Sequence, residues 1–292
     1  MPDYENAIEI KDLTKKYDGF TLDAITFSVP KGCIMGFIGQ NGAGKTTTIQ
    51  ALLNIIKTDG GSIQMLGMDH LKDEYAIKEQ IAAVFDELPF HDNFTANQVN
   101  TIFKGLYGNW NEAQFFAYLD RFCLPRKKKL KKFSKGMKMK LQIATALSHG
   151  AKLLIMDEAT TGLDPVVRNE ILDIFREYIQ DEDHSILMSS HITSDLEKIA
   201  DCVTFIDRGK ILLTGFKDEI LERHGVMKCS KADFEAIPAG DYISARLNDF
   251  GVELMVADLS AAKRQYPDFA FDPTTLEEIT LFYVNQGKKV WQ

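Results

Sequence analysis

The most informative segment of the chain reads Gly39-Gln40-Asn41-Gly42-Ala43-Gly44-Lys45-Thr46. It follows an apolar run over residues 33–38 and precedes a helical pattern over residues 46–56. Glycines let the backbone curl so that successive N–H groups point at phosphate oxygens, and the start of the next helix adds partial positive charge. Lys45 brings a full charge to the β- and γ-phosphates, and the Thr46 hydroxyl can ligate Mg²⁺. The spacing therefore predicts a phosphate-binding loop for a nucleotide.

A second segment, further along the chain, supplies carboxylates for the same chemistry. The apolar run Leu153–Met156 ends in Asp157 and Glu158. An acid at the end of a buried strand is where a carboxylate that organises Mg²⁺ belongs, and this position is Asp157. Glu158 follows it and could polarise a water for attack on the γ-phosphate. Two acids at a strand end are common, so it is the combination with the phosphate loop that predicts one metal–nucleotide site.

Three more motifs complete an ordered set. They read Phe133-Ser134-Lys135-Gly136-Met137, Gly162-Leu163-Asp164-Pro165 and Ser189-Ser190-His191. With these five motifs over roughly residues 5–220, the chain resembles the ATP-binding cassette (ABC) ATPases, and specifically the ATP-binding subunits of bacterial ABC-2-type exporters. The resemblance implies an ATPase that binds and hydrolyses ATP and powers separate membrane subunits through ATP-driven closure of a dimer.

The resemblance also implies a role for each matching position. Tyr17 matches an aromatic residue that stacks on adenine, and His191 matches a switch histidine that hydrogen-bonds the γ-phosphate. The residues expected to bind ATP are Tyr17, Gly39, Asn41, Gly42, Ala43, Gly44, Lys45, Thr46 and Thr47. The expected catalytic residues are Lys45, Glu158 and His191, and the expected Mg²⁺ ligands are Thr46, Asp86 and Asp157.

Two segments depart from the family pattern. The signature usually reads Leu-Ser-Gly-Gly-Gln, and here Lys135 adds a positive charge while Met137 removes a side-chain amide. Asp86 replaces a glutamine; a carboxylate can bind Mg²⁺ or its water, but it adds negative charge and cannot donate when ionised. In the family the signature acts on ATP held by the opposite subunit, which implies a head-to-tail homodimer or heterodimer. The expected contacts to the partner's ATP are Ser134, Gly136 and Asp164.

Apolar strands alternate with helical patterns along much of the chain, which predicts a parallel sheet covered on both faces. The expected fold is an α/β P-loop NTPase (ABC ATPase) core with an antiparallel β subdomain, a helical subdomain and a small C-terminal α+β appendage. The expected boundaries are 1–224 for the ATP-binding domain, about 87–150 for its helical subdomain, and 225–292 for the C-terminal accessory domain. The main expected helices are 46–56, 95–107, 112–122, 138–147, 166–178, 194–200 and 274–285.

Composition and net charge further limit the classes of function that the chain can have. Among 292 residues, 34 Lys and Arg against 42 Asp and Glu give a net charge of −8, which argues against a general nucleic-acid binder. The chain has no run of about 20 mostly apolar residues, as a membrane-spanning helix requires. Together with the resemblance, this implies a peripheral protein at the cytoplasmic face of the cell membrane. Its expected partners are transmembrane permease subunits and a second ATP-binding subunit.

Two other functions remain open on the residues alone. A soluble ABC ATPase acting on ribosomes or DNA would share the same motifs, but the second cassette, long coiled coil or zinc module usual in such proteins is not seen. Another phosphate-loop enzyme, such as a kinase, would have no use for the Ser134–Gly136 and His191 elements. Residues 225–292 show no chemistry, and structural capping is preferred there over regulation or a dimer contact.

Overall fold

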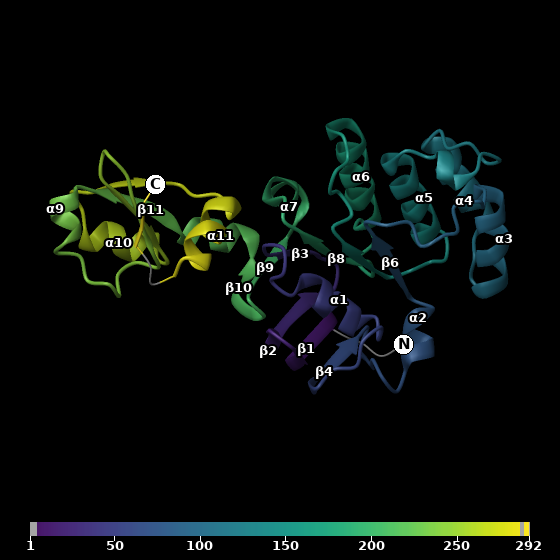
Figure 1. The fold of residues 1–292 in the computed structure, drawn as a ribbon, viewed down its shortest axis with the longest axis horizontal. Helices are drawn as coiled ribbons and strands as arrows, with labels where there is room; N and C mark the ends of the chain where they lie inside the picture. The colour runs from purple at the N-terminus through teal and green to yellow at the C-terminus, as the bar shows by residue number, and fades with distance from the viewer. Residues whose placement is uncertain (1–4, 287–288, 292) are drawn as a thin grey trace.

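The computed structural model describes residues 5–286 and 289–291 and arranges their strands in three sheets (Figure 1). Figure 1 shows the central sheet in the middle of the molecule, the helices of residues 96–147 at one end and the elements after residue 225 at the other. This arrangement confirms the expected α/β class, with an antiparallel β part, a helical part and a C-terminal α+β part.

The central sheet contains the expected buried strands. Its order is β10-β9-β3-β8-β7-β6; β10 is antiparallel to β9, and the others run parallel. All residues of β3, β7 and β8 are buried, as their uninterrupted apolar runs predict for strands covered on both faces. The strands are β3 (Ile34–Ile38), β6 (Ile81–Phe85), β7 (Leu153–Asp157), β8 (Ser185–Ser190), β9 (Cys202–Asp207) and β10 (Lys210–Phe216).

A smaller antiparallel sheet, in the order β2-β1-β4-β5, packs against the central one. Its strands are β1 (Asn6–Tyr17), β2 (Phe20–Pro30), β4 (Gly60–Met65) and β5 (Met68–Asp69). Residues of both sheets share one hydrophobic cluster, in which the rings of Phe27 and Phe37 stack with centroids 5.2 Å apart. The β1–β2 hairpin therefore stays fixed beside the strand that leads into the phosphate loop.

Helix α1 follows the phosphate loop and is shorter than expected. It covers Lys45–Leu52, so the prediction that it extends to residue 56 is wrong. Asn54 has φ of +55°, a left-handed conformation that Asn tolerates and that ends a helix. The other helices near this sheet are α2 (Glu74–Lys78), α6 (Pro165–Tyr178), α7 (Thr193–Ile199) and α8 (Lys217–Arg223).

The helical part consists of α3 (Ala96–Leu106), α4 (Glu112–Arg121), the 3₁₀ turn η1 (Leu130–Lys132) and α5 (Lys135–Leu147). Helix α5 begins three residues before the expected start at residue 138. Ser134 is its N-cap, because its hydroxyl oxygen accepts a hydrogen bond from the Met137 backbone N–H at 3.2 Å. Lys135 and Gly136 therefore lie in the first turn of a helix, with their backbone N–H groups at its positive end.

The C-terminal part has its own sheet, in the order β14-β11-β13-β12-β15. Its elements are β11 (Gly225–Cys229), α9 (Lys231–Phe234), β12 (Ala245–Leu247), β13 (Val252–Val256), α10 (Leu259–Gln265), β14 (Ala270–Asp272), α11 (Leu276–Val284) and β15 (Lys289–Trp291). Helix α11 joins this part to the core, since Leu276, Ile279 and Phe282 belong to the same hydrophobic cluster as residues of α7. The Leu276 backbone N–H also donates to Glu197 Oε1 of α7 at 2.7 Å.

No helix within residues 5–286 and 289–291 is long and apolar enough to cross a membrane. All four cysteines are free, and burial raises the pKa of Cys202 to about 12. That thiol therefore stays protonated and acts as a small apolar group in the core.

Candidate functional site

The carboxyl ends of four neighbouring strands bring the predicted site residues to one edge of the central sheet. The register pairs Phe85 with Asp157 and Asp157 with Ser189. It also pairs Ser190 with Ile38. The residues that come next along these strands are Asp86, Glu158, His191 and Gly39. This edge of a parallel sheet is where α/β proteins bind their ligands.

The backbone of the phosphate loop requires glycine at Gly39 and Gly44, and Gly42 also has a positive φ, of +80°. A Cβ on Gly39 would lie 2.5 Å from the Ile206 carbonyl oxygen, and Gly44 has φ of +118°. A side chain would clash at the first position and strain the backbone at the second. The loop residues Asn41 and Gly42 are exposed to solvent, so its outer turn is open to a ligand.

Lys45 lies beneath this loop, with 5% of its side chain exposed. Its ammonium donates to the Gly39 carbonyl oxygen at 2.6 Å and lies 3.0 Å from Glu158 Oε1. A buried cation needs such partners, because an unpaired charge in the interior is costly. Lys45 therefore links the phosphate loop to the predicted catalytic carboxylate, while the neighbouring Thr46 and Thr47 are exposed and half-buried.

Glu158 is the centre of the network. It has φ of +54°, a backbone conformation that costs a residue with a side chain about 1–2 kcal/mol. Its N–H donates to Ser189 Oγ at 3.0 Å. Its Oε2 accepts from the Thr161 hydroxyl at 2.7 Å and lies 2.6 Å from His191 Nδ1. The strained backbone thus aims the carboxylate between Lys45 and His191, and such strain is found at functional sites.

The surroundings of Glu158 decide its protonation. Burial raises the pKa of this carboxyl, but the Thr161 hydroxyl, the Lys45 ammonium and His191 together outweigh burial and hold the pKa below its ordinary value. Glu158 is therefore ionised at neutral pH. Because an ionised carboxylate can only accept, His191 carries a proton on Nδ1 in this contact. An ionised carboxylate at this edge is chemically able to take a proton from an attacking water.

The predicted Mg²⁺ ligands fall into two groups. Ser189 Oγ donates to Asp157 Oδ1 at 2.6 Å, which orients this buried carboxylate at the strand end. Asp157 and the exposed Thr46 hydroxyl offer oxygen ligands of the type that Mg²⁺ prefers, so this part of the site fits the ion. Asp86 differs, because its Oδ1 lies 2.5 Å from the Lys135 ammonium. Its role as a metal ligand stays a prediction.

The residues expected to act on a partner's ATP lie at two helix starts. Ser134 caps α5, and Asp164 caps α6 by accepting from the Val166 and Val167 N–H groups at 3.1 and 3.0 Å. A Cβ on Gly136 would lie 3.3 Å from the Val167 side chain, so the two helix starts are close neighbours. Ser134 and Asp164 are exposed. They form one outward-facing surface, outside the hydrogen bonds of the Glu158 network.

Tyr17 is exposed at the end of β1 and is 45% accessible to solvent. It pairs with Phe20 across the hairpin. The Phe20 ring lies 3.2 Å from the position that a Cβ on Gly44 would occupy. The hairpin end is therefore next to the phosphate loop, and the exposed ring of Tyr17 leaves a face available for stacking. Its contact with adenine stays a prediction.

Two residues of the network were not expected from the sequence. Ser189 holds both the Asp157 carboxylate and the Glu158 backbone, and Thr161 holds the Glu158 side chain. A signal existed for Ser189, because an apolar strand that ends in Ser-Ser-His carries hydroxyls to the same edge as Asp157. Thr161 lies three residues beyond Glu158 in a loop, and loop geometry gives no periodic pattern from which this contact could be read.

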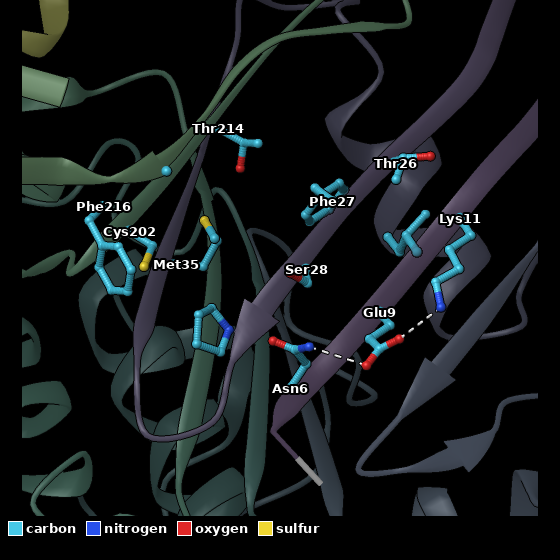
Figure 2. Close-up of a pocket in the computed structure, with 13 residues that line it drawn as sticks. Asn6, Glu9, Lys11, Thr26, Phe27, Ser28, Met35, Cys202, Thr214 and Phe216 are labelled. Atoms are coloured by element: carbon cyan, nitrogen blue, oxygen red, sulfur yellow. Dashed lines mark hydrogen bonds and ion pairs between the residues drawn. The ribbon is translucent and has the colours of Figure 1, made fainter. Parts of the chain in front are cut away.

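A second cavity is separate from this site. A groove of about 520 Å³ lies between the β1–β2 hairpin and the strands β9 and β10, and Figure 2 shows the residues that line it. Its lining mixes apolar side chains, among them Phe27, Met35, Cys202 and Phe216, with polar ones. Asn6 and Glu9 at its rim belong to the opposite end of β1 from Tyr17. The groove contains none of the residues expected to bind ATP.

Three histidines outside the site are buried, and two of them, His149 and His224, have perturbed pKa values. His149 Nε2 lies 2.9 Å from the Ile81 carbonyl oxygen, and its ring lies against Tyr107 with centroids 4.4 Å apart. His224 contacts the Ile220 carbonyl oxygen and the Tyr283 hydroxyl, each at 2.7 Å. Burial lowers the pKa of both below the ordinary 6.5. They pack the core and play no part in the Glu158 network.

These histidines predict a loss of stability in mild acid. Below about pH 6.5 the unfolded chain binds protons that the folded chain does not, so the free energy of unfolding falls as pH decreases. We expect the urea midpoint to be lower at pH 5.5 than at pH 7.5, and His224→Gln to reduce this difference. His91→Gln is the matched control, because His91 is exposed. A pH effect that is equal in wild type and His224→Gln would contradict the prediction.

Comparison with known proteins finds relatives of this chain among the ATP-binding subunits of transporters. A family model described as ABC transporter matches residues 22–161. The Bacitracin transport ATP-binding protein BcrA of Bacillus licheniformis is 38% identical over 70% of this chain and 68% of its own length. The Daunorubicin/doxorubicin resistance ATP-binding protein DrrA of Streptomyces peucetius is 29% identical over 94% of this chain and 91% of its own length. The second match extends through most of the C-terminal part.

A third relative and a solved structure are also ATP-binding subunits of transporters. The Lantibiotic transport ATP-binding protein SrtF of Streptococcus pyogenes is 34% identical over 70% of this chain and 89% of its own length. A structure described as the ATP-binding subunit of an ABC transporter superposes with a TM-score of 0.67 at 28% identity, covering 73% of this chain and 91% of that one.

Proposed function

The chain belongs to the ABC transporter family, and from this premise we propose that it is the ATP-hydrolysing subunit of an exporter. The observation that carries the proposal is the network at the sheet edge, in which Glu158 contacts both Lys45 of the phosphate loop and His191. The names of three relatives refer to bacitracin transport, daunorubicin/doxorubicin resistance and lantibiotic transport, which supports export as the direction.

The chain's own residues account for each task in ATP hydrolysis. Lys45 would leave Gly39 and Glu158 for the β- and γ-phosphates, which frees Glu158 to accept a proton from water. Thr46 and Asp157 would hold Mg²⁺, which neutralises charge on the phosphates, and Asp86 is the third proposed ligand. His191 would keep its contact with Glu158 and face the γ-phosphate. Tyr17 would stack on adenine, while Asn41, Gly42, Ala43 and Thr47 would surround the phosphates.

The active unit in this proposal is a dimer. The exposed surface formed by Ser134, Gly136 and Asp164 would contact ATP held by a second ATP-binding subunit. The start of α5 supports this role, because free N–H groups at a helix start attract an anion. ATP would then join the two subunits, and hydrolysis would release them. Residues 1–224 would form the ATP-binding domain, with its helical subdomain at about 87–150, and 225–292 the accessory domain.

A groove of about 280 Å³ between α2, β6 and α3 is the proposed seat of a permease segment. Its lining includes Pro89 and Phe90, which follow Asp86 in the chain, Tyr107, and residues of β6 and α5. Exposed apolar side chains on the flanking helices, Tyr75 at 77% and Leu106 at 68%, enlarge the apolar surface. A surface of this kind on a monomer indicates a protein partner. The chain would thus sit at the cytoplasmic face of the membrane.

Charges on these flanking helices are expected to uncouple the chain from its membrane partner. Tyr75→Glu and Leu106→Glu should each reduce the amount of permease that co-purifies by about tenfold, because a carboxylate is costly to bury in an apolar contact. ATP binding should stay within twofold, since neither residue lies at the sheet edge. Phe250→Glu is the control, because Phe250 is fully exposed on the C-terminal part. Unchanged recovery of the permease in both variants would remove this docking surface.

The proposed activity has a direct test. Membranes containing the chain and its co-expressed permease should release phosphate from ATP, and removal of Mg²⁺ should stop the release. The soluble alternative, an ABC ATPase acting on ribosomes or DNA, is not favoured, because the relatives named above are subunits of transport or resistance systems. ATP hydrolysis that needs ribosomes or DNA, and no membrane protein, would support that alternative instead.

A further inference from the structure

Two side chains that depart from the family pattern lie against each other. Lys135 is the first residue of α5, and Asp86 follows the last residue of β6. The Lys135 ammonium is 2.5 Å from Asp86 Oδ1. An extra cation in the signature and an extra anion after β6 therefore form one ion pair. The two departures are thus a single feature of this chain.

The Lys135 side chain also crosses a third segment. A Cβ on Gly162 would lie 3.1 Å from the Lys135 ammonium nitrogen and 3.7 Å from Cε. Gly162 belongs to the loop between Glu158 and Asp164, and its φ is +71°. Lys135 thus connects the start of α5, the end of β6 and the loop that follows the catalytic carboxylate.

Helix α5 holds the end of β6 at a second point. Gln142 lies seven residues after Lys135, which is two helical turns, so the two side chains share a helix face. The Phe85 N–H donates to Gln142 Oε1 at 3.2 Å, and Gln142 Nε2 donates to the Phe85 carbonyl oxygen at 3.0 Å. This buried amide fixes the strand end, and it leaves Asp86 directly facing the start of α5.

The ion pair affects the charge that an incoming nucleotide meets. Phe85 pairs with Asp157, so Asp86 and Glu158 leave neighbouring strands at the same level. The edge carries three carboxylates, on Asp86, Asp157 and Glu158, and a triphosphate adds more negative charge. The Lys45 ammonium pairs with the Glu158 carboxylate at 3.0 Å, and the Lys135 ammonium pairs with the Asp86 carboxylate at 2.5 Å. Without Lys135, the Asp86 carboxylate would lose the cation that it contacts in this structure, and its negative charge would stay at the same end of the sheet as the phosphate loop.

We propose that Lys135 is a positioning residue for ATP binding, which acts by neutralising Asp86 and by holding the start of α5 against β6. The inference rests on the proposed function and concerns the same site. Both side chains are partly exposed, at 42% and 45%, and exposed pairs have modest effects. The proposal therefore predicts that the effect of substituting Lys135 on ATP affinity depends on whether Asp86 is present.

The test measures the dissociation constant for a fluorescent ATP analogue with Mg²⁺ in four chains: wild type, Lys135→Met, Asp86→Asn and the double variant. Lys135→Met should weaken binding by about three- to tenfold, the effect of one partly screened charge. The double variant should bind within twofold of Asp86→Asn, because position 86 then carries no charge for Lys135 to neutralise. Lys135→Arg should retain the wild-type affinity, since it keeps the charge.

Lys138→Met is the matched control. Lys138 lies one turn further along α5 in the same hollow, but it pairs with Asp92 at 3.4 Å and not with Asp86, so its loss should change affinity less than twofold. A Lys135→Met loss that is just as large in the Asp86→Asn background would overturn the proposal, as would an equal loss in Lys138→Met. Failure of wild type itself to bind the analogue would refute the proposed function. Additive losses with normal wild-type binding would refute only the ion-pair inference.

Discussion

Glu158→Gln is expected to stop ATP turnover while MgATP still binds. The substitution keeps the size of the side chain and removes the group that would take a proton from water. General-base catalysis contributes about 10²–10⁴-fold, so phosphate release should fall by at least about 100-fold. Binding should persist, because Lys45 and the loop backbone remain. The amide also loses its attraction for the Lys45 ammonium, 3.0 Å away, which should make that ammonium more available to phosphates.

Two measurements check the expectation for Glu158. Phosphate release reports turnover, and nucleotide retained after rapid gel filtration reports binding. Glu170→Gln is the control. Glu170 lies on α6, away from the sheet edge, and pairs with Lys140 at 2.7 Å. Turnover of Glu158→Gln within twofold of wild type would remove Glu158 as the base. Loss of both turnover and binding would instead assign it a role in holding Lys45.

Lys45→Ala is expected to abolish tight nucleotide binding. The Lys45 ammonium is buried beside Gly39 and lies 3.0 Å from Glu158 Oε1. Its loss removes a charge-assisted contact to the phosphates and also leaves the Glu158 carboxylate without its cation. A charged hydrogen bond lost with its partner left unpaired costs about 2–5 kcal/mol, so affinity for MgATP should fall by at least about 30-fold.

Titration calorimetry with MgATP measures this loss. Lys72→Ala is the control, since Lys72 is 82% exposed and pairs only with the nearby Asp69 at 3.7 Å among the described ion pairs. Lys45→Arg should also bind poorly, because the larger guanidinium does not fit the 2.6 Å contact with Gly39. An affinity of Lys45→Ala within threefold of wild type would contradict the assignment of the phosphate loop.

The sequence predicted the parts of the site that lie at strand ends. Apolar runs located β3, β7 and β8, and parallel pairing then requires that Gly39, Glu158 and His191 share an edge. Contacts made by loops could not be predicted this way. The φ of +54° at Glu158 and its bond to Thr161 depend on the tertiary structure, which no periodic pattern encodes.

Helix boundaries and long-range packing were also not predictable from sequence patterns. The early start of α5 depends on the Ser134 cap, and the early end of α1 on the backbone of Asn54. The pairing of Lys135 with Asp86 joins residues 49 positions apart. The docking of α11 on α7 through Glu197 joins residues 79 positions apart. Composition and spacing place each of these residues on an element, and only the packed structure shows which elements meet.

In the function proposed above, this ATPase works on separate membrane subunits. The most direct test of this claim is affinity purification of the tagged chain from detergent-solubilised membranes of its source cells, with identification by mass spectrometry. We expect a protein with several membrane spans to co-purify with the wild-type chain and to be lost with Tyr75→Glu and Leu106→Glu. Recovery of ribosomal or DNA-associated proteins, with no membrane protein, would contradict the claim.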